Sequence, residues 1–408
     1  KLSSQCQFLT QNARMRQELD ITGQITALAG TIKSEELDEV TRLQALSAAR
    51  DLLETLESPV ERIIQDVVMN PPILTSIRMG VQLGIFTQIS QNPEHGVTAQ
   101  EIAERSGASP IVVDQFLRLL AVTGYVDQHA QRFKPSVRTM VMADPNMEAT
   151  TRACFDIGNC CTSKAPEFFR QNKNQFPSSA RDTPFQFGLN TDLNYFEWLD
   201  QNPALAKDFQ QWMALKQEAT ASWTDWFDIQ KHIIDGFDVQ SPDNVLLVDV
   251  GGGEGKYLRE FKEKFPTAPG QLVLQDLPNV VSAIENPPDV ELMAHDFFTP
   301  QPVKGARTYF MHWILHDWSD ERCRSILTNI VAAMKPDYSR LILHESLLPD
   351  TNCDLSSACM SIMMMLQVAA FERSEEQWRD LLESVGLSHV TFYQSPGNGE
   401  GIIEAIKL

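Results

Sequence analysis

The sequence lacks the features that mark three large classes of protein. It has no basic face for nucleic acid, because 34 lysines and arginines stand against 54 acidic residues, for a net charge of −20. No apolar run approaches the roughly 18–20 residues of a membrane span, and the first residues, KLSSQ, do not resemble a signal peptide. We therefore expect no nucleic-acid partner and no membrane partner.

Cysteine is also too sparse and too scattered to organise the chain. The seven cysteines show neither the paired spacing of secreted proteins nor a Cys/His pattern typical of zinc. We expect reduced thiols, a cytoplasmic location and no metal site.

What is present is the composition of a large globular protein. The 408 residues are 43% hydrophobic and 22% charged, enough for two or three domains with substantial cores. Changes in pattern divide the chain into residues 1–145, 146–240 and 241–408.

The segment from about residue 20 to 68 predicts helices. Apolar residues recur there at helical spacing, in two groups: Ile21, Ile25, Leu28 and Ile32, then Leu43, Leu46, Leu52, Leu53 and Leu56. Standing alone, such helices would expose an apolar stripe. We expect them to pack on the next segment or on a second subunit.

Residues 70–145 predict a winged-helix pattern of three helices and a hairpin. The expected elements are helices over Pro72–Leu83, Thr98–Arg105 and Pro110–Val122, then strands over Tyr125–Asp127 and Arg132–Lys134. Such a unit invites a DNA-binding interpretation. Six basic and six acidic residues over 71–145, and an apolar third helix, favour packing or dimerisation instead.

Residues 150–240 are rich in aromatic side chains, interrupted by Pro, Asn and Gln. Helices and loops that join two domains fit this composition. The aromatic residues either line a pocket for a flat apolar ligand or form an ordinary interdomain core.

From residue 245 onward, short apolar runs alternate with helical stretches. The expected strands are Leu246–Asp249, Gln271–Gln275, Thr308–Leu315 and Leu341–His344, and the expected helices are Lys256–Phe265, Asn279–Ile284 and Asp320–Met334. This alternation predicts an α/β fold with a doubly wound parallel sheet. Val390–Tyr393 and Gly401–Ile406 predict a closing hairpin.

A glycine loop follows the first of these strands, in Leu246–Gly255. Lys256 stands where a dinucleotide fingerprint needs its third glycine, and Gly255-Lys256-Tyr257 lacks the hydroxyl residue of a phosphate loop. Asp249 would repel phosphate and attract an ammonium group. The loop therefore fits an amino-acid-bearing nucleoside, with its carboxylate near the loop N–H groups.

Two later acidic residues extend this binding pattern. Asp276 ends the second strand, at the spacing of a carboxylate that holds ribose hydroxyls. Asp296 and Phe297 offer a carboxylate and an aromatic ring for an adenine.

A histidine closes the next apolar run, in His316-Asp317. Ligands of open α/β sheets bind at the carboxyl ends of strands, so His316 faces the expected binding mouth and can take a proton from a hydroxyl. A carboxylate on its other ring nitrogen would set the tautomer. Glu345 and Glu372 are both candidates for that partner.

Four methionines precede Glu372 on an expected helix: Met360, Met363, Met364 and Met365. They either adapt to a flat ligand or simply form core, and Met363 is the best candidate for the pocket.

These motifs together resemble a known family. DVGGGEG, QDLP, HDFF, WILHDWSDE, LILHESLLPD and FERSEEQW occur in the order found in S-adenosylmethionine-dependent O-methyltransferases of plants and, more closely, of fungi. The likeness covers roughly residues 70–408. It implies a class I methyltransferase (Rossmann-like) catalytic domain over 241–408, a helical connector and substrate-pocket region over 146–240, and an N-terminal winged-helix-like dimerisation domain over 1–145.

The resemblance also implies roles for individual residues. For S-adenosylmethionine it implies Asp249, Gly251, Gly253, Asp276, Leu277, Asp296, Phe297 and His312. For catalysis it implies His316 as base, Asp317 beside the substrate, and Glu345 and Glu372 steadying the imidazole. For the substrate it implies Trp313, Met363 and Gln367. Plant members often have Lys at His312 and Asn at Gln367.

The function we expect is methylation of a phenol or enol hydroxyl on a small aromatic, polyketide-like or alkaloid-like natural product, by a homodimer. Some fungal relatives bind the same cofactor but catalyse pericyclic ring formation without methyl transfer, and this alternative stays open. A winged-helix DNA regulator is a third alternative, disfavoured by the charge balance.

Overall fold

The computed structural model describes residues 21–32, 37, 39–218, 222–240, 244–284, 290–395 and 399–408. The first residues, KLSSQ, lie outside these ranges. Two compact units are present, Lys1–Thr75 and Ser76–Leu408, and each is described by itself. Within the described residues, no helix is long and apolar enough to cross a membrane.

The first unit is helical, as its apolar spacing predicts. Residues 21–32 form a helix, followed by α2 (Glu39–Leu56), α3 (Pro59–Ile64), the π-helical turn η1 (Gln65–Met69) and the start of α4 (Asn70–Gln82). The predicted apolar stripes are exposed: Ile21, Ile25, Leu28, Ile32, Leu46, Leu52, Leu53 and Leu56. The side chain of Leu43 lies outside the described part.

The second unit begins with the predicted winged-helix pattern. Its elements are the rest of α4, α5 (Ile85–Ser90), α6 (Ala99–Ser106), α7 (Pro110–Val122), β1 (Val126–His129), β2 (Arg132–Pro135) and α8 (Val137–Met142). β1 and β2 pair antiparallel. The expected capping box forms at α6, because Thr98 accepts from the Glu101 N–H and Glu101 accepts from the Thr98 N–H.

Helix α7, the apolar third helix of this pattern, is only partly buried. Val113, Leu117 and Leu120 are buried, but Ile111 and Val112 on its first turn are exposed. A helix at the edge of a small domain buries only the stripe that faces its own core.

The aromatic middle region divides into two groups. The first comprises α9 (Pro145–Ala153), η2 (Cys154–Asn159), α10 (Cys160–Gln171), α11 (Pro184–Leu189), α12 (Tyr195–Gln201) and α13 (Pro203–Glu218), which share a core with α18 (Leu355–Val368). The second comprises α14 (Trp223–Trp226) and η3 (Gln230–Ile234), whose aromatic and aliphatic side chains pack on the large sheet described next. The aromatic residues of this region thus belong to two separate hydrophobic cores.

The sheet has seven strands in the order β5-β4-β3-β6-β7-β9-β8. They are β3 (Val245–Val250), β4 (Gln271–Asp276), β5 (Glu291–Ala294), β6 (Thr308–His312), β7 (Arg340–Ser346), β8 (Leu387–Gln394) and β9 (Glu400–Lys407). β3 to β7 pair in parallel, whereas β9 is antiparallel to both neighbours, which confirms the closing hairpin.

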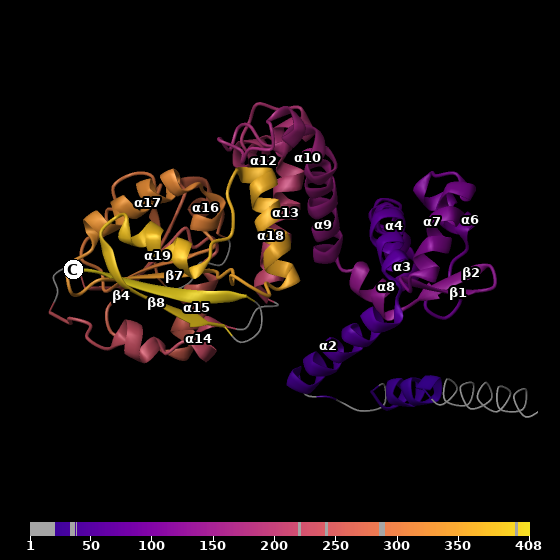
Figure 1. Cartoon of the computed structure of the whole chain (residues 1–408), viewed down its shortest axis with the longest axis horizontal. Helices are drawn as coiled ribbons and strands as arrows, with labels where there is room; N and C mark the ends of the chain where they lie inside the picture. Colours follow the sequence, from indigo (N-terminus) through magenta and orange to yellow (C-terminus); the bar gives the residue numbers. More distant parts are fainter. Residues whose placement is uncertain are drawn as a thin grey trace, which may run out of the picture. The chain divides into compact units, whose positions relative to one another are not determined.

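Helices cover both faces of this sheet, which confirms the predicted doubly wound α/β fold (Figure 1). α17 (Asp320–Ala333) and α19 (Glu375–Glu383) pack on one face, and α14 and α15 (Lys256–Lys264) pack on the other. α16 (Pro278–Ala283) connects β4 to β5. Strand β5 was not predicted, because its few residues carry little periodicity.

The third predicted strand is shorter than expected. β6 ends at His312 instead of continuing to Leu315. Trp313 has a φ of 48°, a left-handed conformation that breaks the extended chain, and Leu315–Asp317 form the 3₁₀ turn η4. An apolar run does not reveal such a break, because the turn buries Leu315 just as a strand would.

Candidate functional site

His316 lies on the turn η4, just beyond the carboxyl end of β6. The residue is 6% exposed, and the turn is anchored where the Cys323 thiol contacts the Leu315 carbonyl oxygen at 3.2 Å. The imidazole Nε2 lies 3.5 Å from Asp317 Oδ1. The histidine is therefore held by a short turn rather than by the strand itself.

The two glutamates left open by the sequence have different contacts. Glu372 Oε1 lies 2.9 Å from His316 Nδ1, in a pair buried from solvent. Glu345 Oε1 instead accepts the backbone N–H groups of Ile314 and Leu315, at 3.1 and 2.9 Å. Glu372 is thus the partner of the imidazole, and Glu345 holds the backbone that carries it.

Arg373 is a further residue of this site that the sequence reading missed. Its buried guanidinium donates to the carbonyl oxygens of Leu315 and Trp318, at 3.1 and 2.8 Å, and to Asp320 Oδ1, at 2.9 Å. It therefore ties together both ends of the turn that carries His316. Its position directly after Glu372 in FERSEEQW was the available signal.

The carboxylates around His316 change its protonation. Burial disfavours the charged imidazole, but Asp317, Glu372 and Glu345 outweigh that effect and raise the pKa of His316 to about 10. Burial likewise raises the pKa of Glu345 to about 7. The cluster therefore stabilises a proton on the imidazole at neutral pH.

A cavity of about 440 Å³ opens beside His316 and Asp317. The predicted substrate residues Trp313, Met363 and Gln367 all line it. Its other walls are mostly apolar side chains of the middle helices and α18: Tyr195, Phe196, Phe209, Trp212, Met213, Met360 and Met364. Aromatic and thioether surfaces of this kind fit a flat apolar molecule.

The glycine loop between β3 and α15 is shaped by close contacts. Gly251 has a φ of 76°, and a Cβ there would lie 2.6 Å from Ile314 Cδ1. At Gly252 a Cβ would lie 2.5 Å from Asp249 Cγ. A side chain at Gly251 would push against Ile314 on the way to His316, and one at Gly252 would push against Asp249 and Leu274.

The N–H groups of this loop are engaged within the protein. Gly251 and Gly252 both donate to the Gln275 carbonyl oxygen, and Gly253 donates to Asp276 Oδ2 at 2.9 Å. The expectation that a ligand carboxylate lies near the loop N–H groups stays a prediction, and these three N–H groups already have acceptors within the protein. The tight turn folds them back onto β4, where they close the loop.

Asp249, in contrast, is buried without a partner. Neither carboxylate oxygen has a hydrogen bond within the described residues, and burial together with the Asp276 charge raises the pKa of Asp249 to about 8. A buried polar group without a partner requires an explanation. The ammonium group of an amino-acid-bearing nucleoside would supply the missing donors, so the site fits that ligand.

The remaining predicted cofactor residues surround the loop. Asp276 accepts from Gly253 and also from the Leu277 N–H, at 2.7 Å, and burial raises its pKa. Asp296 is exposed and accepts the Phe298 N–H, while the Phe297 ring reaches within 3.7 Å of the Cβ position of Gly251. The structure therefore brings these residues to one edge of the sheet.

His312 ends β6 on the side covered by α15. Its Nε2 lies 2.7 Å from the Tyr257 hydroxyl, and its ring stacks on Trp313 with centroids 4.5 Å apart. The nearest histidine, His344, occupies the paired position on β7.

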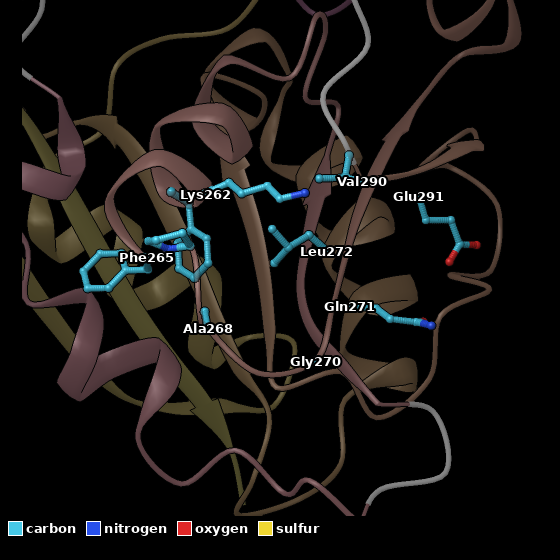
Figure 2. Close-up of a pocket in the computed structure, with 10 residues that line it drawn as sticks. Lys262, Phe265, Ala268, Gly270, Gln271, Leu272, Val290 and Glu291 are labelled. Atoms are coloured by element: carbon cyan, nitrogen blue, oxygen red, sulfur yellow. The ribbon is translucent and has the colours of Figure 1, made fainter.

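A second cavity, of about 340 Å³, lies at the start of β4 and β5 (Figure 2). Leu272 and Val290 lie between Lys262 on one side and Gln271 and Glu291 on the other. Ligands of open α/β sheets bind at the opposite, carboxyl ends of strands, so this cavity is not part of the candidate site.

The fold and the glycine-loop site define the class of S-adenosylmethionine-dependent methyltransferases. The O-methyltransferase domain family matches residues 154–388, and the chain belongs to that family, in its fungal branch. The chain is accordingly an O-methyltransferase-family enzyme that uses S-adenosylmethionine.

Three fungal relatives show the extent of the similarity. O-methyltransferase penC of Penicillium thymicola is 35% identical over 394 residues, covering 95% of this chain and 96% of that protein. O-methyltransferase asqD of Emericella nidulans is 37% identical over 342 residues, covering 83% and 87%. Demethylsterigmatocystin 6-O-methyltransferase of Aspergillus parasiticus is 33% identical over 346 residues, covering 84% and 88%.

Solved structures match most of the length of the chain. LepI in complex with S-adenosylmethionine superposes with a TM-score of 0.84 at 29% identity, covering 96% of this chain and 100% of that one. A pericyclic reaction enzyme gives 0.82 at 29%, covering 97% and 100%. OxaC in complex with S-adenosylhomocysteine and oxaline gives 0.80 at 22%, covering 95% and 98%, a likeness of fold.

Proposed function

We propose that this enzyme methylates a phenol or enol hydroxyl of a small, flat, largely apolar natural product, with His316 as general base. The observation that carries the proposal is the environment of His316: Glu372 is bound at Nδ1, and Nε2 lies beside Asp317 at the apolar cavity. When bound, S-adenosylmethionine supplies an electrophilic methyl group.

The raised pKa of His316 suits this task. A phenol has a pKa near 10, and the imidazole has a pKa of about 10, so proton transfer between them is nearly balanced in free energy. Glu372 stabilises the imidazolium that forms and keeps the other proton on Nδ1. Because only the neutral imidazole accepts a proton, the rate should increase as the pH rises towards 10.

The other polar residues have supporting roles in this proposal. Asp317 lies beside the acceptor, and Glu345 and Arg373 position the turn that carries His316. For the cofactor we propose Asp249 at the ammonium group, Asp276 and Leu277 at the ribose, Asp296 and Phe297 at the adenine, and Gly251 and Gly253 around them. His312, which the resemblance implied for the cofactor, contacts Tyr257 instead and is not assigned to it.

The cavity supports the substrate class. Trp313, Met363 and Gln367 are the proposed substrate residues, and Tyr195, Phe209 and Trp212 extend the apolar wall. A planar polycyclic phenol matches this lining. One relative is named for action on demethylsterigmatocystin.

The test uses methyl-labelled S-adenosylmethionine and a panel of planar polycyclic phenols, with products followed by mass spectrometry. We expect label in the product of the wild type, a loss of at least about 10²-fold in His316→Ala, and unchanged cofactor affinity by calorimetry. His389→Ala, at an exposed histidine of β8, is the matched control. Near-wild-type turnover in His316→Ala would refute the base assignment.

A second candidate function is pericyclic ring formation on the same fold. The observation that favours it is the 29% identity to a pericyclic reaction enzyme over nearly the whole chain. Product formation without S-adenosylhomocysteine would establish this alternative, whereas equal amounts of methylated product and S-adenosylhomocysteine would exclude it for that substrate.

We also propose a cytoplasmic homodimer with the three-part division at residues 145 and 240. The support is the exposed apolar stripe of the first unit and the six free cysteines of the described residues. Light scattering should give twice the chain mass, and Leu53→Arg with Leu56→Arg should give monomer. Val122→Arg, at an exposed apolar residue of α7, is the control. A monomeric wild type would refute the dimer.

A further inference from the structure

Three metal-ligating side chains meet on the face of the sheet that α15 covers. His312 ends β6, His344 occupies the paired position on β7, and Glu400 begins β9 opposite Ser346. One donor atom from each of the three residues lies within 4.8 Å of the others, and the side chains are 9%, 1% and 5% exposed respectively. The three residues stand far apart in the sequence, so no spacing motif announces them.

The imidazole of His344 lacks the partners that burial demands. Neither of its ring nitrogens has a hydrogen bond within the described residues. A neutral imidazole carries one donor and one acceptor, and leaving either unmet in the interior is costly. A bound water or ion is one way in which native proteins satisfy such a group.

We propose that His312, His344 and Glu400 form a binding site for a divalent transition-metal ion, zinc being the best match. Two imidazoles and one carboxylate are a common zinc set, whereas magnesium and calcium prefer oxygen ligands throughout. His344 Nε2 lies 3.5 Å from Glu400 Oε2. Two ligands about 2.0–2.1 Å from a tetrahedral ion are separated by about 3.4 Å.

The hydroxyl group of Tyr257 supports His312 as a ligand. Tyr257 on α15 contacts His312 Nε2 at 2.7 Å, and its ring lies 4.3 Å from that of His312. Outer hydrogen bonds of this kind orient metal-binding imidazoles in proteins. Tyr257 is buried, so the contact persists away from competing water.

The site would join three strands just behind the catalytic turn. His312 stacks on Trp313, and the Trp313 ring lies 6.2 Å from that of His316. A metal ion would therefore fix the ends of β6 and β7 and the start of β9. The turn η4 follows the end of β6. Its role is structural, and it does not depend on which reaction the enzyme catalyses.

The experiment measures metal content in the full-length chain, produced with added zinc and without a histidine tag. Inductively coupled plasma mass spectrometry should find about one zinc per chain after dialysis. His344→Gln and Glu400→Gln should each lose most of that zinc. His232→Gln, at a buried histidine bound to Glu404, should retain it.

Two further measurements use the wild type, so they test the site even if the variants fold poorly. A strong chelator should lower the melting temperature of the wild type by several degrees, and zinc should restore it. Cobalt in place of zinc should give the visible absorption of a four-coordinate site. Neither readout needs a methyl acceptor, so this proposal and the proposed function fail separately.

Three results would overturn the metal site. The first is a wild type without metal whose melting temperature responds to neither zinc nor chelator. The second is zinc retained equally in His344→Gln and Glu400→Gln. The third is a high-resolution map with only water between the two imidazoles.

Discussion

Glu372→Gln removes the negative charge beside His316 while nearly preserving side-chain shape. Glu372 Oε1 and His316 Nδ1 are 2.9 Å apart, and both residues are buried from solvent. The amide can still accept the Nδ1 proton, so geometry is retained and charge is lost. We expect the pKa of His316, about 10 in the wild type, to fall.

The size of the fall follows from the distance. Charge centres roughly 4–5 Å apart at an effective dielectric constant of about 20 attract by about 3–4 kcal/mol, or about 2–3 pKa units. Opposite charges at such distances shift pKa values by about 1–3 units. Because Asp317 and Glu345 still face the imidazole, we expect a decrease of about 1–3 units.

The assay is a pH titration by nuclear magnetic resonance of protein labelled at histidine Cε1. The His316 signal is identified by its absence in His316→Ala, and no methyl acceptor is needed. Glu376→Gln, at an exposed carboxylate of α19, is the control and should leave the midpoint unchanged. An unchanged midpoint in Glu372→Gln, or a wild-type midpoint near the ordinary 6.5, would refute the reasoning.

Three further predictions concern the loop and the turn. Asp249 has a pKa raised from 3.8 to about 8, so its contribution to stability is fully present below pH 3.8 and is lost progressively as the pH rises from about 4 to 8. Asp249→Asn should abolish that loss in thermal melts and weaken S-adenosylmethionine binding by about 10–100-fold in calorimetry. Gly251→Ala should lower the free energy of unfolding by about 1–3 kcal/mol in denaturant titrations, because its Cβ would meet Ile314. Gly253→Ala, which has a positive φ but open space around the Cβ position, should cost less. Equal costs for the two variants would contradict the close approach of Gly251 to Ile314. Arg373→Met should lower the free energy of unfolding by about 3–5 kcal/mol in the same titrations, since it leaves the Leu315 and Trp318 carbonyl groups unpaired. A decrease below about 1 kcal/mol would show that the Arg373 hydrogen bonds to the turn are dispensable.

The chain itself determined the class of fold. Period-two and period-3.6 patterns, with Gly, Ser and Thr at element ends, were enough to place the winged-helix pattern, the capping box at Thr98 and the alternating strands and helices. The ordered motifs determined the family in the same way. These signals are local, because each depends on neighbours along the chain.

Only the tertiary structure decided which residues meet. Glu345 and Glu372 were equivalent candidates in sequence, and the packing of η4 against α18 and β7 gave the imidazole to Glu372 and the turn backbone to Glu345. His344 lies in the LILHESLLPD motif and Glu400 in none, and nothing in the sequence pairs them; they meet because β9 runs antiparallel to β7. Contacts between distant segments depend on strand order and register, which composition and periodicity do not specify.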